Sequence, residues 1–140
     1  MPHRPMRTLI ADAFRWTEWE ATIREHGLTI DRPEGQPHPD YPHIIYPIDY
    51  GYINDTRAPD GGGIDVFVGT ASNGLVGLMR TTDYRRGDEE VKLIYNCTPR
   101  EIYTAHGFIN FDRSLLKGTL VMRYPMETLW AERSEAAASP

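Results

Sequence analysis

The sequence is poor in cysteine, and it has no long apolar run. The single cysteine, Cys97, rules out a disulfide within the chain and is compatible with a reducing cytoplasm. No apolar run approaches the length of a membrane span, and the first fourteen residues lack the apolar stretch of a signal peptide. We therefore expect a cytoplasmic protein that makes no membrane contact.

Basic residues are also few, and the charge balance is acidic. Lys and Arg number 15 against 20 Asp and Glu, which gives a formal net charge of −5. Proteins that bind nucleic acid or anionic membranes normally present clustered Lys and Arg, so we expect neither partner. An acidic protein that handles phosphate would need metal ions to offset the charge.

The composition is typical of one turn-rich globular domain over residues 1–140, with 40% hydrophobic residues, 12 glycines and 11 prolines. Six short segments are rich in β-branched and aromatic residues and are bounded by Gly, Pro, Asn or Asp. They predict a mainly β (α+β) fold built on a meandering antiparallel sheet or barrel. The segments span residues 28–31, 43–53, 63–69, 74–82, 90–96 and 116–124.

Two helices are predicted beside these strands. Apolar residues at three- and four-residue steps, followed by Gly27, predict an amphipathic helix over residues 14–26. The segment TPRE at 98–101 has the residues of a capping box, with proline at the first helical position, and predicts a helix over about 99–110. The tail over residues 126–140 is expected to add one helical turn and then to fray.

Acidic residues stand at the ends of several predicted strands. Strand ends gather at one rim of a small barrel, so these carboxylates could converge with a lysine to hold hard cations and a phosphate. Acids at strand ends are usually solvated turn residues, so the spacing alone is a weak signal and leaves both interpretations open. The residues concerned are Asp60, Asp65, Asp83, Asp88, Glu89, Glu90 and Lys92.

Several sequence motifs taken together indicate a protein family more specifically than any one of them does alone. YPIDYGYIN followed by DGGGID resembles the soluble, magnesium-dependent inorganic pyrophosphatases (family I), whose hallmark is a YPxNYGYI-type strand leading to a D-x-D-P-x-D loop. TTDYRRGDEEVKL is similar to the D-x(4)-D-x-K segment of that family with a short insertion, and LKGTLV to its strand after the last helix. The resemblance covers roughly residues 28–122 and is closest to a short, diverged branch of the family.

This resemblance implies a fold and an activity. The fold would be a five-stranded OB-like barrel over residues 28–124, with a helix before it and another before the last strand. Mg²⁺ ions, for which Mn²⁺ could substitute, would lie on the open face of the barrel. The implied activity is hydrolysis of inorganic pyrophosphate, or a related phosphoanhydride, by a metal-activated water in a homo-oligomer.

The resemblance also implies roles for individual residues. The metal ligands would be Asp60, Asp65, Asp83 and Glu90, with Asp31 as a weaker match. Phosphate would be bound by Tyr50 and Lys92, with Arg113 and Arg32 as weaker matches. The catalytic set would be Asp60, Asp65, Lys92 and Tyr50.

The sequence departs from the family in two places. The middle acid of the loop motif, which in the family orients and deprotonates the attacking water, is here Gly62, and the proline after it is Gly63. The early basic hairpin is shortened to residues 32–41, where Arg32 is the only Lys or Arg. The alternative is therefore a catalytically weakened protein that binds metal and a phosphate-bearing ligand or a partner.

Some questions stay open at this level. A neighbouring acid could replace the missing base, and the candidates are Asp55, Asp88 and Glu89. Arg85 and Arg86, in the insertion DYRRGDEE, could reach the rim as phosphate ligands or point to solvent. Binding of single-stranded nucleic acid by an OB-type fold is a third hypothesis, which the net negative charge disfavours.

Overall fold

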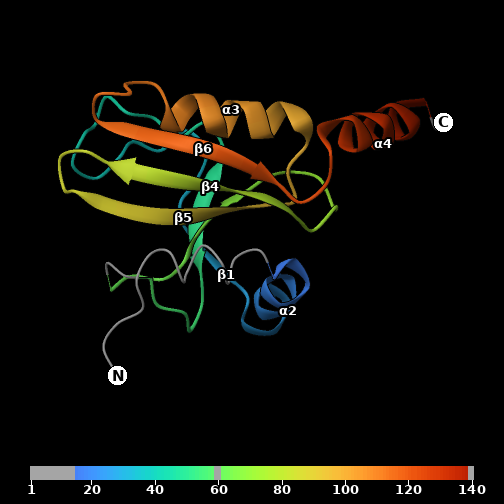
Figure 1. Ribbon diagram of the computed structural model, residues 1–140, viewed down its shortest axis with the longest axis horizontal. Helices are drawn as coiled ribbons and strands as arrows, with labels where there is room; N and C mark the ends of the chain where they lie inside the picture. Colours follow the sequence, from blue (N-terminus) through green and yellow to red (C-terminus); the bar gives the residue numbers. More distant parts are fainter. Residues whose placement is uncertain (1–14, 59–60, 139–140) are drawn as a thin grey trace.

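The computed structural model describes residues 15–58 and 61–138 and is shown in Figure 1. In chain order its elements are α2 (Trp16–His26), β1 (Leu28–Arg32), β2 (Asp49–Ile53), β3 (Asp65–Val68), β4 (Leu75–Asp83), β5 (Asp88–Tyr95), α3 (Pro99–Ile109), β6 (Leu116–Met122) and α4 (Met126–Ala138). Most of these elements are strands. The mixed α+β class expected from the sequence is confirmed.

The strands form one six-stranded sheet in the order β1-β2-β3-β5-β4-β6. Neighbouring strands are antiparallel except β3 and β5, which run parallel, so the expected antiparallel meander is wrong at this point. β4 and β5 form a hairpin that ends with the opposed pair Asp83 and Asp88, and β6 takes the outer edge of β4. The remaining edge of β5 therefore pairs with β3.

The expected five-stranded OB-like barrel is not supported, because the six-stranded sheet stays open. β1 and β6 lie at opposite ends of the strand order, and the central residues of β4 and β5 are buried on both faces. Strands that are apolar on both faces need cover on both sides. Figure 1 shows α3 along one side of the sheet and α2 on the other, so the fold is layered.

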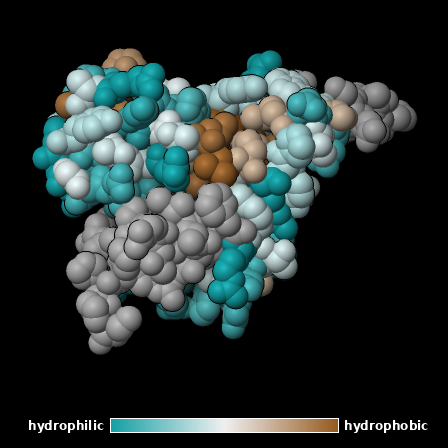
Figure 2. All heavy atoms as spheres, in the orientation of Figure 1, coloured by the Kyte–Doolittle hydropathy of each residue, from teal (hydrophilic) through white to brown (hydrophobic). Residues whose placement is uncertain are grey.

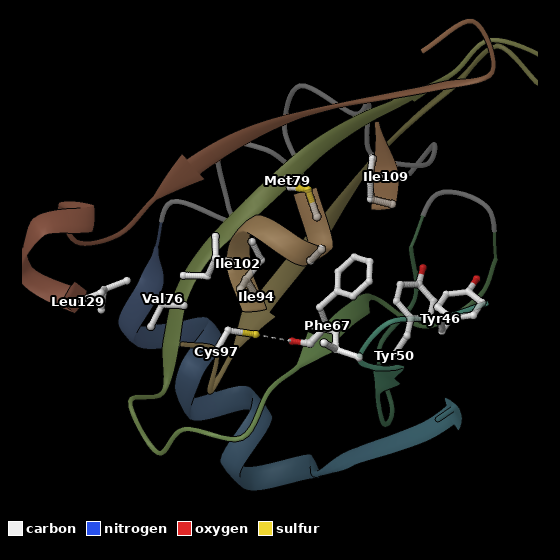
Figure 3. Close-up of a cluster of buried hydrophobic side chains, with 12 residues drawn as sticks. Tyr46, Tyr50, Phe67, Val76, Met79, Ile94, Cys97, Ile102, Ile109 and Leu129 are labelled. Carbon is white, nitrogen blue, oxygen red and sulfur yellow. Dashed lines mark hydrogen bonds between the residues drawn. The ribbon is translucent and has the colours of Figure 1, made fainter. Parts of the chain in front are cut away.

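Each face of the sheet has its own hydrophobic core. On the α3 side, Phe67, Met79 and Ile94 pack with Ile102 and Ile109 of the helix, as Figure 3 shows. Cys97 belongs to this core, and burial raises the pKa of its thiol, so the thiol stays protonated at neutral pH. On the other face, α2 contributes to a cluster made of Trp16, Trp19, Ile23, Ile53, Ile64, Val66, Leu75, Leu78, Val91 and Leu93.

Both predicted helices form. α2 is followed by Gly27, whose φ of 77° suits glycine at a helix end. α3 starts with the expected capping box, in which the Thr98 hydroxyl accepts from the Glu101 N–H at 3.2 Å and the Glu101 carboxylate accepts from the Thr98 N–H at 2.9 Å. The tail is longer than one helical turn: α4 runs Met126–Ala138, and Leu129 anchors it in the α3-side core.

The strand expected over residues 43–53 is shorter than predicted, since β2 begins only at Asp49. Proline has no N–H to donate to a neighbouring strand, and Pro47 stands just before β2. The preceding segment folds back on itself instead, with an isolated bridge between Pro37 and Ile45. This small hairpin carries several aromatic residues to the edge of the sheet.

Most of the coloured residues in Figure 2 are polar, and a strip of apolar residues lies near the centre of the view. Among the helices that the structure describes, none combines the length and the apolar character needed to cross a membrane.

Glu20 joins α2 to β4 and to the end of β6. Its Oε2 accepts the N–H of Leu75 at 2.8 Å and an N–H of Arg123 at 3.0 Å. Burial alone would raise the pKa of Glu20, but the Leu75 N–H and the guanidinium groups of Arg123 and Arg24 lower it below 4.5. A carboxylate with a lowered pKa stabilises the fold above its unfolded pKa, and this stabilisation is lost as the pH falls through the folded pKa.

We expect Glu20→Gln to lower the free energy of unfolding by about 1–2 kcal/mol at neutral pH, because the charge-assisted bonds to Leu75 and Arg123 are lost. The deficit should shrink as the pH falls below 4.5, since the unmodified protein then loses the same contribution. Urea unfolding at a series of pH values measures both effects. Glu25→Gln, an exposed change on the same helix, is the control, and a deficit independent of pH would contradict this role.

Candidate functional site

Lys92, in the middle of β5, brings together residues from three strands. Its side chain is buried, with 8% of the residue exposed. Nζ donates to the hydroxyl of Tyr50 at 2.7 Å, to Oδ2 of Asp65 at 3.0 Å and to Oε2 of Glu90 at 3.3 Å. Four of the predicted site residues, Tyr50, Asp65, Glu90 and Lys92, therefore meet, and we call them the Lys92 cluster.

The strand period and the register explain why these side chains share one face. Glu90 and Lys92 are two residues apart on β5, so both point to the same side. The parallel pairing of β3 and β5 sets Asp65 beside Lys92, and the antiparallel pairing of β2 and β3 sets Tyr50 opposite Phe67. The next residues in these rows, Phe67 and Ile94, belong to the α3-side core. The Lys92 cluster thus lies where this core ends.

The charges of the Lys92 cluster are closely coupled. Burial alone would lower the pKa of Lys92, but the Tyr50 oxygen and the carboxylates of Asp65 and Glu90 raise it well above its ordinary value. Burial also raises the pKa of Tyr50, so its phenol stays neutral. A buried ammonium is stable only when it is paired and hydrogen-bonded, and here one ammonium faces two carboxylates. The side chains of Asp65 and Glu90 remain 23% and 18% exposed, so solvent reaches them.

Arg32 reaches the same group of residues from β1. It pairs with Tyr50 in the register of β1 and β2, and its Nη1 donates to the hydroxyl of Tyr46. Its guanidinium lies 5.4 Å from the ring centroid of Tyr46 and 5.7 Å from that of Tyr50, while Nζ of Lys92 lies 5.2 Å from the same Tyr50 ring. Figure 3 shows Tyr46 and Tyr50 side by side at one end of the core. Arg32 is therefore joined to the Lys92 cluster through the Tyr50 ring.

Asp83 has a turn role in this structure. It ends β4 opposite Asp88, and its Oδ1 accepts the N–H groups of Arg85 at 3.0 Å and Arg86 at 3.2 Å. In the register of the hairpin Asp83 lies one same-face step, about 7 Å, beyond the residue opposite Glu90. The carboxylate thus closes the hairpin beside the cluster rather than joining the hydrogen bonds of Lys92.

The other predicted site residues do not belong to the Lys92 cluster. Asp31 is exposed, at the irregularity of the β1–β2 pairing between Ile30 and Arg32. Arg113 is exposed between α3 and β6, and within the described part of the chain no hydrogen bond or ion pair joins it to the cluster. Asp60 lies outside the described residues.

The glycine loop before β3 is explained in part by packing. A Cβ atom at Gly63 would come within 2.6 Å of the Tyr52 ring and 2.9 Å of its Cβ, so a proline or any larger residue does not fit there. Gly62 is exposed. The residue types at these two positions supply no acid or base.

Sequence reasoning missed three side chains near the site. One is Tyr46, whose hydroxyl accepts a hydrogen bond from Arg32. His38 and Tyr41 lie on the small hairpin before β2, with the His38 ring 6.2 Å from that of Tyr46 and 5.2 Å from that of Tyr41. The signal was the alternation of aromatic residues with prolines, which by itself indicates only a stiff extended segment.

The Lys92 cluster contains two carboxylates that a metal ion could bind. Over the described residues, no group of three or more His, Cys, Asp or Glu side chains is placed to hold a metal. Asp65 and Glu90 are two partly exposed carboxylates on one rim, which both contact Lys92. Mg²⁺ keeps several waters and is usually bound by one or two carboxylates together with substrate phosphates.

No model of a known protein family matches the sequence, and no curated protein is significantly similar to it.

We expect Lys92→Met to lower the free energy of unfolding by about 2–3 kcal/mol at neutral pH, because Asp65 and Glu90 lose their cation and Tyr50 loses its donor. Chemical denaturation measures the change. Lys117→Met, at an exposed position on β6, is the matched control and should change stability by less than about 0.5 kcal/mol.

A second variant separates charge pairing from packing. Lys92→Met combined with Asp65→Asn should lose less than the sum of the single changes, because the orphaned carboxylate is then absent. Strict additivity, or a Lys92→Met variant as stable as Lys117→Met, would show that the Lys92 cluster is not a coupled unit.

Proposed function

We propose that this protein hydrolyses inorganic pyrophosphate, or a related phosphoanhydride, to phosphate with the help of Mg²⁺, for which Mn²⁺ could substitute. The observation that supports the proposal is the Lys92 cluster. Tyr50, Asp65 and the pair Glu90 and Lys92 come from separate segments of the sequence, each of which resembles a pyrophosphatase motif, and their side chains touch. The proposal includes a cytoplasmic homo-oligomer with a small-molecule phosphate substrate.

The metal would be held by Asp65 and Glu90, with Asp60 and Asp83 as the further acids that the resemblance indicates. Mg²⁺ bound there would neutralise charge on the phosphoryl group and make a nucleophilic water available near neutral pH. Carboxylates engaged with a cation would bond less strongly to the Lys92 ammonium. Lys92 could then donate to a phosphate oxygen.

The residues of the chain itself would bind and orient the substrate. Lys92 stays charged because its partners raise its pKa, so it can bind a phosphate oxygen at neutral pH. The neutral phenol of Tyr50 accepts from Lys92 and hydrogen-bonds the carboxylate of Asp65; once Asp65 binds the metal, the O–H of Tyr50 would be released to donate to the same phosphate. Arg32, over the Tyr50 ring, adds a second positive charge. These fixed donors would stabilise charge that develops in the transition state.

The second candidate function is binding without turnover. It is favoured by Gly62, which stands where the resembling motif has its middle acid and can supply no base. A positioned general base typically contributes about 10²- to 10⁴-fold to the rate, so its loss can leave a weak enzyme or a binding protein. The Lys92 cluster would serve either function.

Phosphate release from pyrophosphate by the purified protein, with and without Mg²⁺, tests the proposal. We expect release only with the metal, and Lys92→Met should lower kcat/KM by about 10²- to 10³-fold, because a charged donor to the transition state is lost. Tyr50→Phe should cost about tenfold. The matched controls are Lys117→Met and Tyr103→Phe, both at exposed positions.

The same assay distinguishes the two candidates. A silent native protein whose Gly62→Asp variant releases phosphate would favour binding without turnover. Activity that is independent of Mg²⁺, or lost equally in Lys92→Met and Lys117→Met, would refute the proposed mechanism.

A further inference from the structure

A second row of side chains runs from Arg32 to Arg85 outside the Lys92 cluster. Nη1 of Arg85 donates to the hydroxyl of Tyr41, and the guanidinium lies 4.7 Å from the centroid of that ring. The Tyr41 ring lies 5.2 Å from His38, which in turn is stacked on Tyr46 at 6.2 Å with an interplanar angle of 13°. Arg32 stands over the Tyr46 ring. We call these five residues the Arg32–Arg85 row.

The row joins three parts of the chain that are distant in sequence. Arg32 belongs to β1, His38 and Tyr41 to the small hairpin before β2, and Arg85 to the turn between β4 and β5. Tyr41 and Arg85 are separated by 44 positions in the chain. The insertion that carries Arg85 is thus folded back over the hairpin, and the guanidinium is held on an aromatic face.

Neither guanidinium is neutralised by an acidic partner in the described residues. Within residues 15–58 and 61–132, no carboxylate lies within ion-pair distance of Arg32 or Arg85. Asp31 acts on Arg32, and Asp40 on His38, only at longer range. The carboxylate of Asp83 accepts the backbone N–H of Arg85 at 3.0 Å and makes no ion pair with its guanidinium. The neighbouring Arg86 differs, because its Nε pairs with Asp88 at 3.1 Å.

The row also has hydrogen-bond donors to offer. A guanidinium has five N–H groups, and among the described residues each of these two makes one side-chain hydrogen bond, to a tyrosine. Nδ1 of His38 accepts the backbone N–H of Asp40 at 3.0 Å, so the hydrogen of the neutral imidazole is on Nε2. Burial, and then the charges of Arg32 and Arg85, lower the pKa of His38, which keeps the ring neutral at neutral pH.

We propose that Arg32, His38 and Arg85 form a second anion-binding site, which holds a second phosphoryl group of the substrate beside the one bound by Lys92. The two sites are continuous, because Arg32 and Lys92 both stand over the Tyr50 ring. Planar guanidinium groups match the oxygens of a phosphate, and their stacking on tyrosine rings fixes their position before the ligand arrives. The inference rests on the proposed function for the identity of the ligand, a diphosphate.

This site accounts for two features of the sequence. Residues 32–41 contain Arg32 as their only Lys or Arg, which is too little charge to hold one end of a diphosphate. Arg85 restores a second cation from a different part of the chain. Arg85 is therefore assigned to ligand binding, and the paired Arg86 is not.

Calorimetric titration with methylenediphosphonate, a diphosphate that cannot be hydrolysed, tests the proposal in the presence of Mg²⁺. We expect Arg85→Gln to raise Kd about tenfold or more, since charge-assisted hydrogen bonds to phosphate are lost. Arg86→Gln is the matched control in the same turn and should change Kd by less than about twofold. Tyr41→Phe keeps the ring but removes the hydroxyl, and a rise in Kd between these two values is expected. Equal effects of Arg85→Gln and Arg86→Gln would overturn the proposal.

Titration with inorganic phosphate gives a second readout. Under the proposal Arg85→Gln weakens the binding of methylenediphosphonate more than the binding of phosphate, because a single phosphate can still bind at Lys92. An equal loss for both ligands would mean that Arg85 does not define a separate site.

The outcome can be separated from that of the proposed function. If the native protein hydrolyses pyrophosphate while Arg85→Gln leaves both Kd and KM unchanged, the second site is wrong and the function stands. If Arg85→Gln weakens the binding of methylenediphosphonate while no form of the protein releases phosphate from pyrophosphate, the second site stands and the hydrolytic function is wrong.

Discussion

β3 and β5 run parallel in the centre of the sheet, and this pairing holds Asp65 against Lys92. β4 does not pair with β3, because its two edges are occupied by β5 and β6. The same pairing continues the apolar rows of β3 and β5, so that Phe67 and Ile94 lie side by side in the core under α3. Core and candidate site are thus two ends of the same rows of side chains.

The polarity of these rows changes where the core ends. A buried ammonium there would be costly without partners, and Tyr50, Asp65 and Glu90 provide them. Arg32, which also lies over the Tyr50 ring, is held by tyrosines rather than by acids. The candidate site therefore has a carboxylate part and a guanidinium part, and the proposed function rests on this charge distribution.

Much of the local structure could be predicted, because it depends on residues that are close in sequence. The capping box of Thr98 and Glu101 and the end of α2 at Gly27 both form as expected. Asp83 shows the limit of such reasoning, since an acid at a strand end can bind a ligand or close a turn. Here it accepts two backbone N–H groups of the turn. Only the folded hairpin distinguishes these roles.

The sequence by itself determined which side chains share a face of each strand, because successive residues alternate between the two faces of a sheet. Glu90 and Lys92 had to point the same way, and so did Tyr46 and Tyr50 if their segment stayed extended. The tertiary structure decided which strands became neighbours, whether the sheet closed, and that Arg85 would rest on Tyr41. Strand order and register follow from the burial of two apolar faces by α2 and α3, which joins segments from the whole chain. No local pattern contains that information.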